Sequence, residues 1–175
     1  MQNDIVNVLF VECHPFASKK MEAALAQLHQ DLSGGSALGH TRWAPDSEHT
    51  LRFVSAGEPD VDLHDRLTSR LAQVDTSVVL TNHFIEERLR FVGVRIAGMR
   101  NGQVDALVVD DEPRYAAGLG DEALKYEARR FLARCAERAE VLWAERPPSE
   151  VELVDLHERH NRPRRTMIRT STSGP

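Results

Sequence analysis

Three consecutive β-strands joined by two tight turns are predicted between residues 76 and 110, and this meander constrains the fold more than any other stretch. The first run, 76–85, is rich in β-branched and aromatic residues and stops at a charged corner, 86–88. The second run, 89–97, is followed by an Asn-Gly pair that readily takes the positive φ angles of a type I′ turn, and a third run, 104–109, comes next. The meander predicts the fold class and identifies no chemistry.

The residues before the meander predict the order strand, helix, strand, helix. The strand 5–12 has apolar residues at both parities, which predicts a central strand covered on both faces. A helix capped by Ser18 has an apolar stripe at helical spacing. A loop over 37–50 precedes a strand at 51–55, and a second amphipathic helix follows Asp60. The apolar positions of the two helices are Met21, Ala24, Leu25, Leu28 and Leu32, then Leu63, Leu67, Leu71 and Val74.

A connector rich in glycine, 112–120, leads from the meander to the longest predicted helix, 121–145. We therefore expect an α+β fold with the order β-α-β-α-β-β-β, helices on one face of a mixed or antiparallel sheet, and a long C-terminal helix. Residues 1–145 are expected to form one domain. Residues 146–175 are expected to form an extension that ends in a disordered basic tail.

Composition excludes several classes of protein. The chain is 41% hydrophobic and 28% charged, as is ordinary for a globular protein, and its apolar runs are far shorter than a membrane span. The N-terminus lacks a basic segment typical of a secretion signal, so we expect a soluble, cytoplasmic protein. Cys13 and Cys135 are expected to be partly buried thiols rather than a disulfide. The net charge of −5 opposes attraction of nucleic acid to the whole surface.

The element order and several local motifs resemble the YubB-like family of ferredoxin-like proteins carried on plasmids and phages. The resemblance covers roughly residues 5–110 and implies a mixed sheet with helices on one face and an origin in a mobile element. It transfers no catalytic residue and no established activity. The residues that carry it are Val6-Asn7-Val8, Gly39-His40-Thr41-Arg42-Trp43, Leu51-Arg52-Phe53, Glu86, Phe91-Val92-Gly93 and Asn101-Gly102.

The corner that follows the first meander strand carries the candidate catalytic residues His83, Glu86 and Glu87. Alternation places His83 and Glu87 on one face of the strand and Glu86 on the other. A His-Glu pair is able to do acid-base work, but no nucleophile, metal or pocket is visible, and a polar hairpin corner is the simpler interpretation. His157 and His160 lack the second pair of close ligands typical of a zinc site. We predict no metal and no cofactor.

The candidate binding residues are mostly arginines on the long helix and in the tail. They are Trp43, Arg130, Arg134, Arg138, Arg159, Arg162, Arg164 and Arg165. A basic tail is able to neutralise phosphates without reading sequence, and it suits an acidic protein partner equally well. Stacking of bases on Phe84 and Phe91 is the other route to nucleic acid, although both rings are expected in the core.

Three functional hypotheses follow from these patterns. The first is a non-enzymatic interaction protein that binds a host or element protein through its sheet edge or long helix, one version being an inhibitor of a host defence system. The second is a nucleic-acid-binding protein that uses the tail, and the third is a small enzyme that uses the His83 corner. A homodimer is compatible with each of them.

Overall fold

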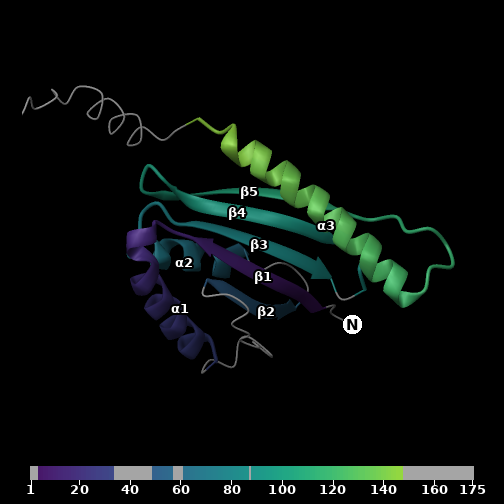
Figure 1. Ribbon diagram of the computed structural model, residues 1–175, viewed down its shortest axis with the longest axis horizontal. Coiled ribbons are helices and arrows are strands. Elements are labelled where there is room, and N and C mark those ends of the chain that lie inside the picture. Colours follow the sequence, from purple (N-terminus) through teal and green to yellow (C-terminus); the bar gives the residue numbers. More distant parts are fainter. Residues whose placement is uncertain (1–3, 34–48, 57–60, 87, 148–175) are drawn as a thin grey trace, which may run out of the picture.

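The computed structural model describes residues 4–33, 49–56, 61–86 and 88–147 of the 175-residue chain. Its helices and strands follow the order that the sequence predicts (Figure 1). They are β1 (Asp4–Glu12), a short 3-10 helix η1 (Pro15–Ala17), α1 (Ser18–Ser33), β2 (Thr50–Ala56), α2 (Val61–Leu71), β3 (Val79–Glu86), β4 (Val92–Arg100), β5 (Gln103–Asp111) and α3 (Asp121–Ala144).

The five strands form one sheet in the order β2-β1-β3-β4-β5. Every neighbouring pair is antiparallel, so the fold is α+β with an antiparallel sheet rather than a mixed one. Strand β1 pairs with both β2 and β3, which confirms that it is an interior strand. The two edges of the described sheet are β2 and β5.

The meander is confirmed as β3, β4 and β5, with the first two strands shorter at their starts than the sequence predicts. Strand β3 begins after a turn in which the Ser77 backbone N–H donates to Asp75 Oδ1 at 2.9 Å. Strand β4 begins only at Val92, because Leu89 takes a positive φ of 60° within the preceding corner. The Asn-Gly turn is as predicted: Asn101 and Gly102 have φ angles of 51° and 75°.

Helices α1 and α2 pack on one face of the sheet, as the sequence predicts. Their stripes meet the inward residues of β1, β2 and β3 in one cluster, which includes Met21, Leu25, Leu63, Leu67, Leu9, Leu51 and Leu80. All of these side chains are 4% exposed or less. This packing buries the apolar stripes of both helices and accounts for their position against the sheet.

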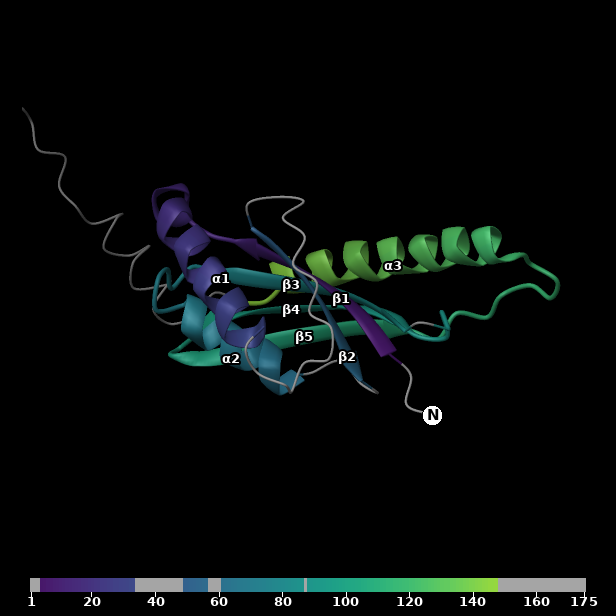
Figure 2. The same ribbon diagram turned by 90° about the horizontal axis from the view of Figure 1, so that it is seen from below.

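Helix α3 lies on the opposite face, so the sheet is covered from both sides (Figure 2). Its buried positions Ala128, Cys135 and Ala139 pack on Val92, Val94 and Ile96 of β4. The small side chains at the contact allow the helix to approach the strands closely. The helix spans nearly the predicted range and begins directly after the irregular connector.

Candidate binding groove

Helix α3 covers only part of its face of the sheet. It packs mainly on β4 and β5 and touches β3 at its margin. Strand β1 therefore has one closed and one open face: Ile5 and Leu9 are buried, whereas Val6 is 45% exposed and Phe10 is 37% exposed. The expectation that β1 is covered on both faces is wrong, because the apolar stripe of α3 packs on the meander strands and does not extend over β1.

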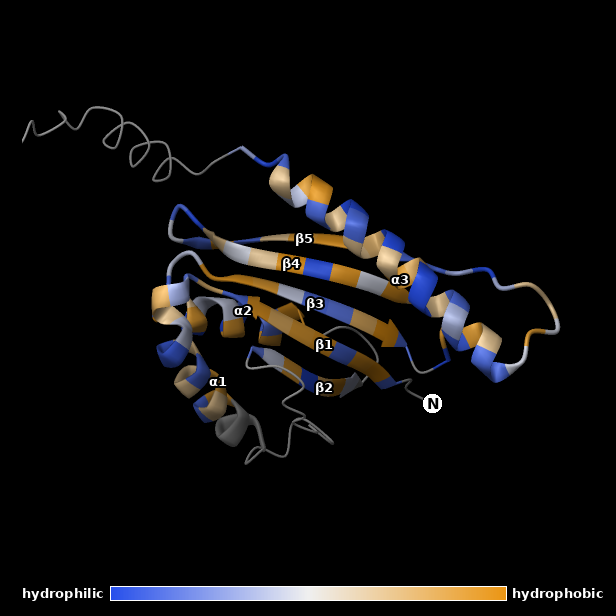
Figure 3. Cartoon of the chain, in the orientation of Figure 1, coloured by the Kyte–Doolittle hydropathy of each residue, from blue (hydrophilic) through white to orange (hydrophobic). Residues whose placement is uncertain are grey.

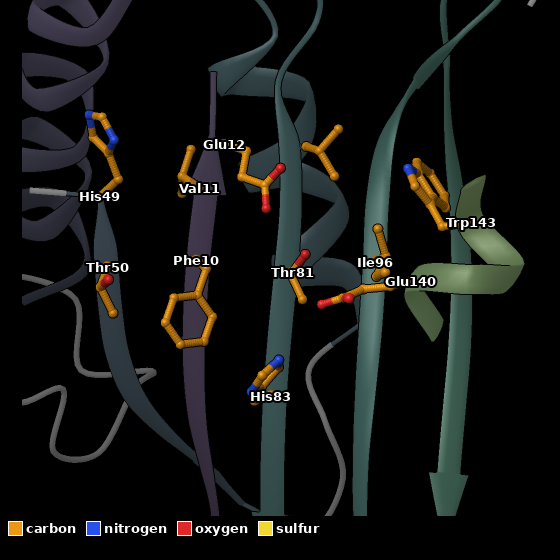
Figure 4. A pocket seen from close by; sticks show the side chains of 11 residues that line it. Phe10, Val11, Glu12, His49, Thr50, Thr81, His83, Ile96, Glu140 and Trp143 are labelled. Carbon is orange, nitrogen blue, oxygen red and sulfur yellow. The ribbon is translucent and has the colours of Figure 1, made fainter. Parts of the chain in front are cut away.

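The uncovered strip beside α3 contains two adjoining cavities that share His83. The larger, of about 710 Å³, lies between the ends of β1 and β3 and the C-terminal half of α3 (Figure 4). The smaller, of about 320 Å³, lies beside the N-terminal half of α3. We call the two cavities together the α3 groove. Figure 3 shows largely hydrophobic residues along β1, which β3 separates from the strands that α3 mainly covers.

His83 stands at the junction of the two cavities, on the face of β3 that points toward α3. Its ring meets the Phe10 ring edge to face at a centroid separation of 5.0 Å. Burial lowers the pKa of His83, and the negative charge of Glu140 on α3 acts in the opposite direction. In Figure 4 the Glu140 side chain extends from α3 toward Thr81 and His83.

Charges of opposite sign line the two ends of the groove. Lys125 and Arg129, on the first turns of α3, line the smaller cavity together with apolar side chains and the buried carboxylate of Glu86. Glu12 and Glu140 line the larger cavity. The four side chains other than Glu86 belong to exposed residues. The groove is therefore apolar along its floor. Its narrow end has two exposed cations beside one buried carboxylate, so the exposed charge there is basic, and the exposed charge at its wide end is acidic.

Two of the three candidate catalytic residues line the same cavity. His83 and Glu86 both line the smaller cavity of the groove; Glu86 is 6% exposed at the end of β3, where its Oε2 accepts from the Arg90 backbone N–H at 3.0 Å. Glu87 lies outside the described residues. In the larger cavity His83 is also accompanied by Glu140, a carboxylate that sequence reasoning missed because it comes from α3 rather than from the corner.

The helical arginines that the sequence selects for binding lie on α3 outside the groove lining and are exposed. Arg130 pairs with Glu127 at 3.0 Å, and the Arg134 guanidinium lies 4.2 Å from the centre of the Phe131 ring. Arg138 lies one turn further along the helix. The remaining candidates, Trp43, Arg159, Arg162, Arg164 and Arg165, lie outside the described residues.

A row of buried polar side chains crosses the other face of the sheet, beneath α2, and we call it the polar seam. Asn82 Nδ2 donates to Asn7 Oδ1 at 2.9 Å, and Asn7 Nδ2 donates to Ser55 Oγ at 3.0 Å. Beside Asn82 on β4, Arg95 donates to His64 Nδ1 and forms an ion pair with Asp65 at 2.6 Å. This seam was not predicted from the sequence, although the polar residues within apolar strands were a visible signal of it.

Burial and the Arg95 charge lower the pKa of His64 to about 3. The ring is therefore neutral at pH 7, with Nδ1 accepting from Arg95 and the proton on Nε2. Among the residues that the structure describes, His64 Nε2 and Asn82 Oδ1 find no hydrogen-bond partner, although both atoms are buried. The seam is costly to bury and restricts which strands and helices can face each other.

The chain's other candidate chemistry is dispersed. Cys13 and Cys135 are free thiols that belong to packing clusters on opposite faces of the sheet. Within the part of the chain that the structure describes, no three His, Cys, Asp or Glu side chains are grouped as metal ligands. None of the described helices has the length and apolar character needed to cross a membrane.

Comparison with known proteins does not assign the chain to a family: no family model, curated protein or solved structure matches it.

Proposed function

We propose that this chain is a non-enzymatic interaction module that binds another protein through the α3 groove. The observation that carries the proposal is the incomplete cover of the sheet, which leaves Val6 and Phe10 exposed on a strand whose alternate residues form the core. Large apolar side chains beside a concavity favour a binding surface, because aromatic and aliphatic anchors in a pocket supply most of the energy of an interface.

The edge of β5 is a poorer contact surface than the groove. Asp105, Asp110 and Asp111 place negative charge along that edge strand. The Arg146 side chain crosses from the end of α3, donates to the Ala106 carbonyl at 2.9 Å and pairs with Asp105. Charges and a covering side chain are the usual protection of an edge against added strands. The groove therefore replaces the sheet edge as the proposed contact.

The family of the module and its origin are part of the same proposal. Its relation to ferredoxin-like proteins of the YubB-like family rests on the sequence motifs already described. An origin in a plasmid or phage follows from that relation, and inhibition of a host defence protein is one specific version of the interaction proposal. Both a host protein and a protein of the same element are candidate partners, and a homodimer through the groove is the alternative arrangement.

Affinity capture from a cell lysate tests the proposal if matched variants are used. Phe10→Ser should remove the captured partner, whereas Leu142→Ser, which changes a side chain with the same 37% exposure on α3, should not. Val6→Ser and Val141→Ser form a second pair, with exposures of 45% and 52%. Equal capture by Phe10→Ser, Val6→Ser and the wild-type chain would refute the groove as the contact.

Acid-base chemistry at His83 is a second candidate function. The observation that favours it is the position of His83 in a concave site with Glu140 and Thr81 nearby. The proposal needs His83 to accelerate a proton transfer, so hydrolysis of an activated ester by the wild-type chain should exceed hydrolysis by His83→Asn. Equal rates would remove His83 as an acid-base group in that reaction.

Nucleic-acid binding remains a third proposal, and it depends on the tail. Phe84 is 1% exposed and stacks on Phe91 at 5.3 Å, so its buried ring is not placed for base stacking. Truncation after Glu158 should abolish binding to nucleic acid and its steep salt dependence while leaving thermal stability unchanged. Binding that survives the truncation would exclude the tail.

A further inference from the structure

We infer that the α3 groove accepts an extended segment of the partner protein in one fixed charge order, with an acidic group at the Lys125/Arg129 end and a basic side chain at the Glu12/Glu140 end. This inference rests on the proposed function and names the chemistry of the segment. It is carried by the shape of the groove, by the opposite charges at its two ends, and by the polar groups at its centre.

The length of the groove suits an extended peptide. From Lys125 to Trp143, α3 covers about 27 Å at ~1.5 Å per residue. An extended chain advances ~3.3 Å per residue, so about eight residues fill this length. Arg129 and Glu140 are separated by about 17 Å along the helix axis by the same rise. The acidic and basic positions of the segment should therefore be about five residues apart.

The charges at both ends are accessible to a ligand. Lys125 pairs with Glu122 at 2.9 Å, but the two side chains are 55% and 89% exposed, so this pair is easily exchanged for another. Arg129 adds a second cation one helical turn away. At the wide end, Glu12 from β1 and Glu140 from α3 stand on opposite sides of the cavity. A segment of the reverse charge order would meet like charge at both ends.

The centre of the groove fits a peptide backbone better than a plain hydrocarbon chain. Phe10, Ile85 and Leu132 supply apolar contacts for alternate side chains of the segment. His83 lies at the junction of the cavities, and the Thr81 hydroxyl lines the larger cavity, so both side chains are able to bond to peptide N–H and C=O groups. A nucleic acid is disfavoured because its phosphates would meet the carboxylates of Glu12 and Glu140.

Selection of peptides from a displayed library of random nonamers against the full chain tests the inference. Enriched peptides should carry Asp or Glu about five positions from Lys or Arg, with apolar residues between them. Charge reversal at both ends of the groove, by K125E, R129E, E12K and E140K together, should weaken a selected peptide at least tenfold. The same protein should recover binding to a peptide in which the acidic and basic residues are exchanged.

A control with the same kind of change outside the groove completes the test. Arg130→Glu with Glu137→Lys alters charge on α3 without touching a groove residue, and it should leave peptide affinity unchanged.

Selected peptides with no charge order, or peptides indifferent to the fourfold reversal, would overturn the inference. If such peptides are still lost with Phe10→Ser, the groove remains a binding site and only its charge order is wrong. If no peptide is enriched, the inference fails, and lysate capture with Phe10→Ser decides the proposed function separately.

Discussion

On strand β1, Ile5 is 1% exposed and its neighbour Val6 is 45% exposed, so one strand contributes to a closed face and to an open one. The closed face is covered by α1 and α2 and contains the polar seam, in which each polar group restricts its neighbours. The open face is covered by α3 only over the meander and keeps a groove beside β1. We conclude that the contacts of the closed face specify how the strands and helices pair. The open face instead leaves apolar surface available for a partner.

The largest effect should come from breaking the polar seam. Arg95→Ala leaves His64 and Asp65 without their cation, and truncating one partner of a buried ion pair costs about 3–5 kcal/mol of unfolding free energy. The lower end of this range applies because Asp65 is 40% exposed and solvent screens the pair. Urea denaturation measures the loss, and Arg134→Ala on the exposed side of α3 should change stability by less than about 0.5 kcal/mol. Equal losses of unfolding free energy for both variants would contradict the distinction between the polar seam and the exposed surface of α3.

The close approach of Gly93 to Phe84 should give the next largest effect. A Cβ atom at position 93 would lie 2.3 Å from Phe84 Cζ and 2.9 Å from Asp110 Cβ. Gly93→Ala should therefore destabilise the protein by about 2–3 kcal/mol through overpacking. Adding Phe84→Leu should recover part of this loss, which a double-mutant cycle in urea would show as coupling. Strictly additive losses would show that the two positions do not clash.

The polar seam should also make stability depend on pH. The folded-state pKa of His64 is about 3, below its usual 6.5, so the unfolded chain binds the proton more readily and stability falls as pH drops from 6.5 toward 3. Between pH 7 and pH 5 this linkage removes about 2 kcal/mol of unfolding free energy. The lowered pKa of His83 acts in the same direction. Denaturation curves at several pH values should show a shallower decline for His64→Leu, and an unchanged decline would contradict this role of His64.

On the open face, substitutions should barely affect stability. Phe10→Ser removes a side chain that is already 37% exposed, so the unfolding free energy should change by about 1 kcal/mol or less. Thermal melts would measure this change. A loss as large as that of Arg95→Ala would mean that Phe10 belongs to the core and that β1 is covered on both faces.

The elements could be predicted from the sequence because their signals are local. Apolar periodicity gave α1, α2 and α3, and the Asn101-Gly102 pair gave the turn between β4 and β5. The face on which α3 docks could not be predicted, because an apolar stripe does not specify which side of a sheet it will cover. The groove depends on that choice, and so does the meeting of His83 with Glu140, which lies after the meander.

The polar seam shows a second limit of sequence reasoning. Asn7, Asn82 and Arg95 are visible in the sequence as polar residues within strands, and alternation assigns each to a face. Their contacts depend on strand order and register, which bring Asn82 beside Arg95 and place Asn7 within reach of Asn82. Those pairings are long-range, and no single strand contains the information for them.

Thiol labelling of single cysteines on β1 compares the two faces within one strand. In a Cys13→Ser background, Val6→Cys should react with a thiol reagent at least about a hundredfold faster than Ile5→Cys, which reacts only through local opening. A peptide selected for the groove should slow the reaction of Val6→Cys and leave that of Ile5→Cys unchanged. Slow labelling of Val6→Cys in the free protein, or labelling that the peptide does not slow, would contradict an open binding face on this side of the sheet.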